Sequence, residues 1–120
     1  MSDTSPVLRL RIVFGPGRMI GPGKAELLER IARTGSIAAA GREMGMSYKR
    51  AWLLVETMNA MFAEPAVTRT RGGARGGGAT VTDTGRAALA AYRGAEAAAL
   101  RAADDEIAAL TALLAPPPEA

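Results

Sequence analysis

The sequence predicts a mainly α-helical fold with a small β-sheet. Apolar residues recur at three- and four-residue spacing between residues 24 and 62 and again after residue 83. A glycine-rich stretch joins two short β-type runs near residue 75, and residues 7–14 alternate as a strand does. Apolar residues make up 48% of the chain and aromatic residues only 4%, so we expect a small core that gains stability from a second subunit.

The N-terminal segment, residues 7–14, reads VLRLRIVF and predicts a strand. Its inward-facing residues would be Leu8, Leu10, Ile12 and Phe14. Two Gly-Pro-Gly sequences at 15–17 and 21–23 predict a turn, and Gly23 would start the next element.

Three short helices are expected next. The first spans 24–34, ends at Gly35 and buries a face made of Leu27, Leu28, Ile31 and Ala32. Ser36 would cap a second helix over 37–44, which Gly45 breaks. Ser47 would cap a third helix that runs to about Phe62.

Residues 36–62 have the features of a helix-turn-helix. Gly45 suits the turn, and Ala40 and Gly41 are small where the second helix must cross the first. Met44 and Met46 flank the turn. The inner stripe of the second helix would consist of Ala51, Leu54 or Val55, and Met58. This arrangement presents a helix to the major groove of DNA, so the sequence predicts a winged helix-turn-helix.

The wing would be formed by runs at 67–70 and 80–82, joined by residues 71–79. A nucleotide-binding loop is a poor alternative, because this stretch has no lysine and returns into a strand. A loop with no role is the other alternative, which leaves the arginines unexplained. The candidate DNA-binding residues on the two elements are Ser36, Ser47, Tyr48, Lys49, Arg50, Arg69, Arg71, Gly72, Gly73 and Arg75. Lys49 and Arg50 could instead be a solvated face, and we expect Trp52 to pack in the core.

Asp83 or Thr84 would cap one long final helix, which the prolines at 116–118 stop and whose length would be about 50 Å. Its first half would pack on its own domain, and its second half would need a partner helix. The candidate dimer seam is Leu89, Tyr92, Ala99, Ala103, Ile107, Leu110 and Leu114. We therefore expect a DNA-binding domain over 1–82, a dimerisation helix over 83–115 and a disordered tail over 116–120.

Charge and composition favour some classes of function and argue against others. Residues 1–82 hold 12 of the 15 Lys and Arg but only 6 of the 12 Asp and Glu, which favours a polyanionic partner for this part. The chain has no Cys and no His, so we expect neither a thiolate or imidazole metal site nor an enzyme. No signal pattern or membrane span is recognisable, and the bacterial cytoplasm is the expected location.

Several motifs resemble the N-terminal domain of the ModE family, whose members are bacterial molybdate-responsive transcription regulators with a LysR-type winged helix. They are RTGSI at 33–37, GMSYKRAW at 45–52, Met58-Asn59, RGGARGGGA at 71–79 and TDTG at 82–85. The resemblance, over about 8–92, implies a winged helix, a dimer made partly through the long helix, and a palindromic promoter site. It also implies a response to molybdate, but nothing in this sequence resembles the family's molybdate-binding region. We therefore expect a naturally short member with no cofactor.

The sequence thus favours a dimeric, sequence-specific DNA-binding transcription regulator. Two alternatives stay open. One is a DNA-binding protein of low specificity, of the nucleoid type, and the other is a winged helix that binds protein.

Overall fold

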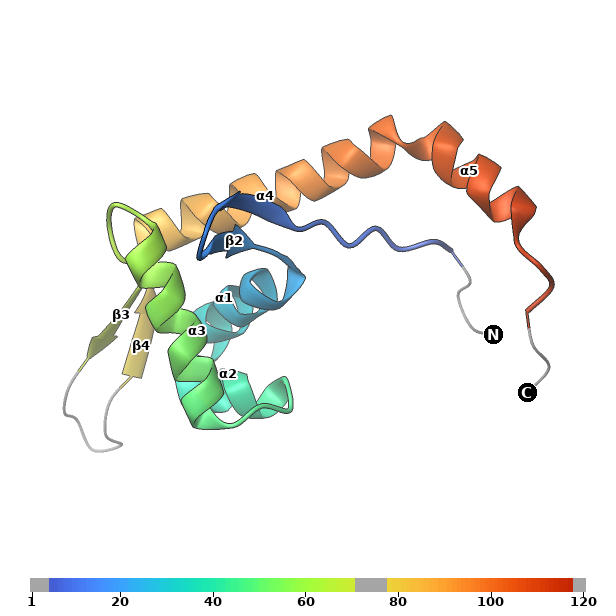
Figure 1. Cartoon of the computed structure of the whole chain (residues 1–120). Helices are drawn as coiled ribbons and strands as arrows, with labels where there is room; N and C mark the ends of the chain where they lie inside the picture. Colours follow the sequence, from blue (N-terminus) through green and yellow to red (C-terminus); the bar gives the residue numbers. More distant parts are fainter. Residues whose placement is uncertain (1–4, 71–77, 118–120) are drawn as a thin grey trace.

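The computed structural model describes residues 5–70 and 78–117, and Figure 1 shows their arrangement. A short hairpin, β1 (Ile12–Gly15) and β2 (Arg18–Ile20), precedes three helices. These are α1 (Pro22–Thr34), α2 (Ile37–Glu43) and α3 (Tyr48–Met61), and the antiparallel strands β3 (Val67–Thr70) and β4 (Gly78–Val81) follow. Two further helices, α4 (Asp83–Ala102) and α5 (Asp104–Leu113), complete a winged helix-turn-helix with a C-terminal helical extension.

Local capping chemistry sets most of the helix ends. Gly35 adopts a φ of 69° after α1, and Gly45 a φ of 72° in the turn between α2 and α3. The Ser36 and Ser47 hydroxyls accept the backbone N–H groups of Ala39 and Arg50, which confirms both predicted N-caps. Two helices begin differently from the prediction. The cap of α4 is Thr82, whose hydroxyl accepts the Gly85 N–H, and not Asp83 or Thr84. The other is α1. It starts at Pro22, because proline suits the first turn of a helix, and not at the predicted Lys24.

The core lies between the first three helices and the β3–β4 sheet. It confirms the inner faces predicted for α1 and α3, except that Ala32 is exposed. Of the two alternatives on α3, Val55 is the buried one and Leu54 is half-buried. The main cluster comprises Leu27, Leu28, Ile31, Ile37, Ala40, Ala51, Val55, Met58, Ala66, Val67, Ala79 and Val81.

The crossing of α2 and α3 depends on small residues. A Cβ atom at Gly41 would lie 3.0 Å from the Cβ of Ala51. Met44 and Met46 pack against the core on either side of the turn, as predicted. The second helix of the motif is thereby held close against the first, at a fixed angle.

The N-terminal strand is shorter than predicted. Leu8, Leu10 and Ile12 are half-buried, in agreement with the alternation, but pairing begins only at Ile12. The predicted inward position of Phe14 is wrong, since its side chain is 60% exposed. Phe14 stands at the end of a two-stranded hairpin, beyond the reach of the core.

A second small cluster joins the hairpin to α4. Tyr92 is only 2% exposed and packs with Ile20 and Ala25, and its hydroxyl donates a 2.6 Å hydrogen bond to the Leu10 carbonyl. Burial raises the pKa of the Tyr92 hydroxyl. The first half of α4 therefore packs on its own domain, as expected.

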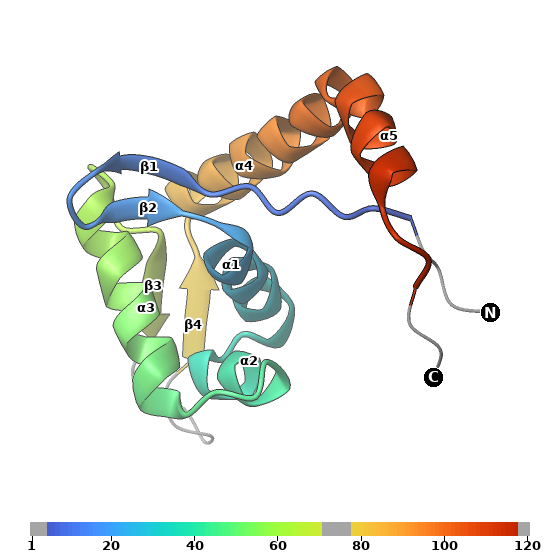
Figure 2. The ribbon, with the colours of Figure 1, turned by 45° about the vertical axis from the view of Figure 1, so that its right-hand side comes forward.

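The prediction of one continuous final helix is wrong. The helix breaks at Ala103, whose φ and ψ are −95° and 10°, and α5 leaves α4 at a marked angle (Figure 2). Three acidic residues, Asp104, Asp105 and Glu106, form the first turn of α5. Aspartate is a poor residue for a helix interior but a favourable one for a helix N-terminus, so this sequence favours a new start.

Beyond the break, α5 ends at Leu113, and Leu114 serves as its C-cap. The outermost part of the predicted tail, 118–120, lies outside the described residues. In the ranges that the structure covers, no helix combines the length and apolar character that crossing a membrane requires.

Candidate nucleic-acid interface

The first turn of α3 presents an exposed basic surface. Tyr48, Lys49 and Arg50 are all exposed, and Ser47 precedes them as the N-cap. The hydroxyl oxygen of Ser47 is engaged by the Arg50 N–H, so its own O–H is the group left to donate outward. The structure thus brings these four predicted residues together at the start of one helix.

The cations of this surface are not neutralised within the described chain, unlike several other arginines. Arg30 and Arg33 both pair with Glu43 and lower the pKa of its carboxyl, and Arg93 pairs with Glu29 and Glu96. Within the described ranges, no carboxylate lies within ion-pair distance of Lys49, Arg50 or Arg69. These three charges are therefore available to an external anion.

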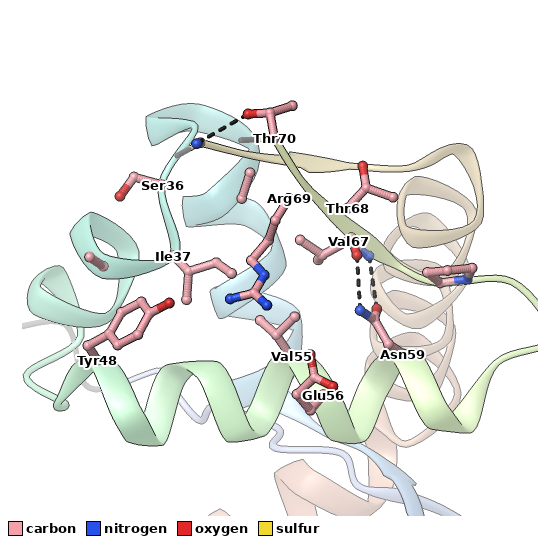
Figure 3. Close-up of a pocket in the computed structure, with 14 residues that line it drawn as sticks. Ser36, Ile37, Tyr48, Val55, Glu56, Asn59, Val67, Thr68, Arg69 and Thr70 are labelled. Atoms are coloured by element: carbon pink, nitrogen blue, oxygen red, sulfur yellow. Dashed lines mark hydrogen bonds between the residues drawn. The ribbon is translucent and has the colours of Figure 1, made fainter. Parts of the chain in front are cut away.

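Arg69 comes from the wing strand β3 and points towards α3 (Figure 3). Its guanidinium carbon lies 5.6 Å from the centre of the Trp52 ring, a cation–π contact. Trp52 itself is half-buried beside this arginine and is not part of the packed core, contrary to expectation. The contact between the two side chains holds the guanidinium over the space between helix and wing.

That space is a groove of about 810 Å³ between α3 and the β3–β4 sheet. Tyr48 and Glu56 line its helix side, and Thr68, Arg69 and Thr70 line its wing side (Figure 3). Ser36 lies at one end, where its oxygen caps α2. The groove therefore brings Ser36, Tyr48 and Arg69 together, whereas Ser47, Lys49 and Arg50 line a separate hollow on α3.

Asn59 fixes the wing to α3, a role that the sequence analysis did not predict. Its amide donates to the Val67 carbonyl at 2.9 Å, and its side-chain oxygen accepts the N–H groups of Ala66 and Val67. One side chain thus imitates a neighbouring strand at the start of β3. The sequence signal was Met58-Asn59, which belongs to the motifs of the resemblance but by itself indicates no contact with the wing.

The rest of the wing root is tied down from two sides. The Ala79 N–H donates to the Gly35 carbonyl at 2.9 Å, which links β4 to the turn before α2. The Thr82 hydroxyl donates to the Pro65 carbonyl at 2.6 Å and accepts the Gly85 N–H. A Cβ atom at Gly85 would lie 2.3 Å from the Ala66 carbonyl oxygen, so only glycine fits there.

The predicted wing-tip residues Arg71, Gly72, Gly73 and Arg75 lie outside the described residues.

The dimer-seam residues separate into two groups. Leu89 and Tyr92 contact the core of their own chain, and Tyr92 has almost no surface left for a partner. Ala99, Ala103 and Ile107 are half-buried, whereas Leu110 and Leu114 are exposed by 64% and 72%. Among the seam residues, the most exposed apolar side chains are therefore Leu110 on α5 and Leu114 at its C-cap.

Comparison with known proteins identifies the family to which this sequence belongs. Residues 23–86 match the family described as bacterial regulatory helix-turn-helix protein, lysR family. The chain is 49% identical over 81 residues to the molybdenum-pterin-binding protein MopB of Rhodobacter capsulatus, covering 68% of this chain and 30% of that protein. It is 40% identical over 96 residues to the molybdenum transport protein ModE of Azotobacter vinelandii, covering 80% and 36%.

A third relative is the DNA-binding transcriptional dual regulator ModE of Escherichia coli, 38% identical over 71 residues, with 59% and 27% covered. The chain thus spans about a third of the length of the curated relatives it matches. These matches confirm the resemblance to ModE-type proteins that the sequence motifs indicated.

Proposed function

The chain belongs to the LysR family of bacterial regulatory helix-turn-helix proteins, and on this premise we propose that it is a dimeric, sequence-specific transcription regulator of the ModE type. The observation that carries the proposal is three exposed cations, Lys49 and Arg50 on the first turn of α3 and Arg69 on the wing strand, with no carboxylate within ion-pair distance in the described parts of the chain. Arg69 lines the groove between α3 and the wing, and Lys49 and Arg50 line a separate hollow on α3.

In the proposed complex, the first turns of α3 enter the major groove. Lys49 and Arg50 donate to the O6 and N7 atoms of guanine or to phosphates. The Ser47 hydroxyl and the free N–H groups at the start of the helix donate hydrogen bonds to a phosphate oxygen. Tyr48 lies on the wing side of the same turn and donates its hydroxyl to the backbone of the DNA.

The wing follows the adjacent backbone. Arg69, held on the Trp52 ring, contacts a phosphate or the edge of the minor groove. The contacts with DNA of Arg71, Gly72, Gly73 and Arg75, which lie outside the described residues, stay part of the proposal. The proposal includes no cofactor in these contacts.

Selection of bound fragments from random duplex DNA, with and without molybdate, tests the function. We expect one enriched, palindromic sequence, bound at least about 1,000-fold more tightly than random duplex at physiological salt. Enrichment without a common sequence would favour the nucleoid-type alternative. If no fragment is enriched and no duplex binds, the DNA-binding proposal fails.

A two-fold dimer would place two α3 helices in successive major grooves. The exposed apolar residues of α5 support this part of the proposal, because Leu110, Leu113 and Leu114 would be shielded from water by a second copy. Ala99, Ala103 and Ile107 would continue the same interface towards α4.

Sedimentation equilibrium at micromolar concentrations should therefore detect a dimer. The double variant Leu110→Asp/Leu114→Asp should shift the protein to monomer, since two buried carboxylates would oppose association. Val13→Asp is the matched control, because Val13 is similarly exposed on the hairpin, and it should leave the dimer unchanged. A wild-type protein that sediments only as monomer would contradict the dimer.

A further inference from the structure

One apolar side chain interrupts the polar outer face of α3. Leu53 is 48% exposed, on the side of the helix opposite the buried residues Ala51, Val55 and Met58. Lys49 lies one turn before Leu53, and Thr57 one turn after it. An exposed leucine thus occupies the middle of the surface that the proposed function turns towards DNA.

Leu53 lies in a shallow hollow of about 220 Å³. The hollow is framed by the Ser47, Lys49 and Arg50 side chains on one side and by Leu54 and Thr57 on the other. The two cations favour an anionic partner, while the leucine offers only an apolar contact. The ligand that fits both is a polyanion that carries a small apolar group.

DNA carries one such group in the major groove, the 5-methyl group of thymine. Cytosine has a hydrogen atom at the same position, so an apolar contact there distinguishes thymine from cytosine. We propose that Leu53 determines specificity by contacting the 5-methyl group of one thymine in each half-site. The inference rests on the proposed function and names a residue that was not among the predicted contacts.

A protein partner at Leu53 is a weaker explanation. A stable protein interface needs about 800 Å² of surface on each partner, with an apolar centre. The remaining large exposed apolar residues of the described chain lie elsewhere, apart from Tyr48: Val7, Val13, Phe14, Leu100, Leu110, Leu113 and Leu114. The apolar spot at Leu53 matches a methyl group in size and not a protein surface.

The test exchanges thymine for deoxyuridine, which removes only the 5-methyl group. In the selected site, each thymine is replaced in turn, and the dissociation constant is measured by fluorescence anisotropy. The wild-type protein should bind about fourfold more weakly when one particular thymine of a half-site is replaced. The Leu53→Ala variant should bind the thymine and deoxyuridine forms of that position equally.

The control is Val13→Ala, which trims an exposed apolar side chain on the hairpin. The hairpin lies near the C-terminal end of α3, away from its basic first turn (Figure 2), so this variant should keep the fourfold difference. Wild-type binding that is equal at every exchanged thymine would overturn the inference, as would an unchanged difference in Leu53→Ala. Either result leaves DNA binding intact, whereas failure of the proposed function would appear as the lack of any selected site.

Discussion

Replacing Lys49 and Arg50 together with alanine is expected to weaken binding to the selected DNA site by at least about 100-fold. Each hydrogen-bonding side chain at a base edge contributes about 1–3 kcal/mol, and the dimer would lack both side chains in both half-sites. If the two residues bind phosphates instead, the slope of log affinity against log salt should fall by about 0.9 for each phosphate that is no longer neutralised. Titrations at several salt concentrations measure both quantities.

A matched control removes the same charge elsewhere. Arg18 on β2 and Arg101 near the end of α4 are also exposed, and Arg18→Ala/Arg101→Ala should change the affinity by no more than about twofold. Both double variants should melt at the wild-type temperature, because none of the four side chains has an ion-pair partner among the described residues. Unchanged DNA affinity in Lys49→Ala/Arg50→Ala would refute the proposed interface.

The largest effect on stability is expected at Gly85. A Cβ atom there would approach the Ala66 carbonyl oxygen to 2.3 Å and the Val81 Cγ1 to 2.7 Å, so the backbone of α4 or of the wing root must move. We expect Gly85→Ala to lower the free energy of unfolding by about 3 kcal/mol, at the upper end of the usual cost of overpacking. Since domains of this size are only marginally stable, Gly85→Val should leave little folded protein. Urea denaturation followed by circular dichroism measures the loss.

Gly94 provides the control on the same helix. A Cβ atom at Gly94 has no neighbour within 4 Å in the described chain, so Gly94→Ala adds helix propensity without a clash. This variant should gain about 0.5–1 kcal/mol. Equal stability changes at the two glycines would show that the close approach at Gly85 is not what constrains it.

The helix-turn-helix could be predicted from the sequence because its determinants are local. Ser36 and Ser47 cap the helices that directly follow them, and Gly45 turns the chain between them. The contact of Gly41 with Ala51 spans only ten residues of sequence and follows from the need for close crossing. Spacing alone therefore located the basic turn of α3.

The features that the sequence did not predict depend on how the wing folds back along α3. Asn59 binds the start of β3 across only seven or eight residues of sequence, and Trp52 lies against Arg69, but neither pairing follows from residue spacing. The break at Ala103 was missed for another reason: a stripe at three- and four-residue spacing continues across it. The acidic residues at the start of α5 indicate a new helix N-terminus, but the continuous apolar periodicity predicts an unbroken helix.

The start of α5 has a consequence for how the protein would meet DNA. Asp104, Asp105 and Glu106 stand beyond the far end of α4, whereas Lys49 and Arg50 stand at the start of α3, in a molecule 55 Å long (Figure 1). Such a separation of charge forms an electric dipole, and the field of a polyanion exerts a torque on a dipole before the two molecules touch. During diffusion the protein would turn its basic end towards the DNA, so that a larger share of encounters begins with α3 facing the duplex.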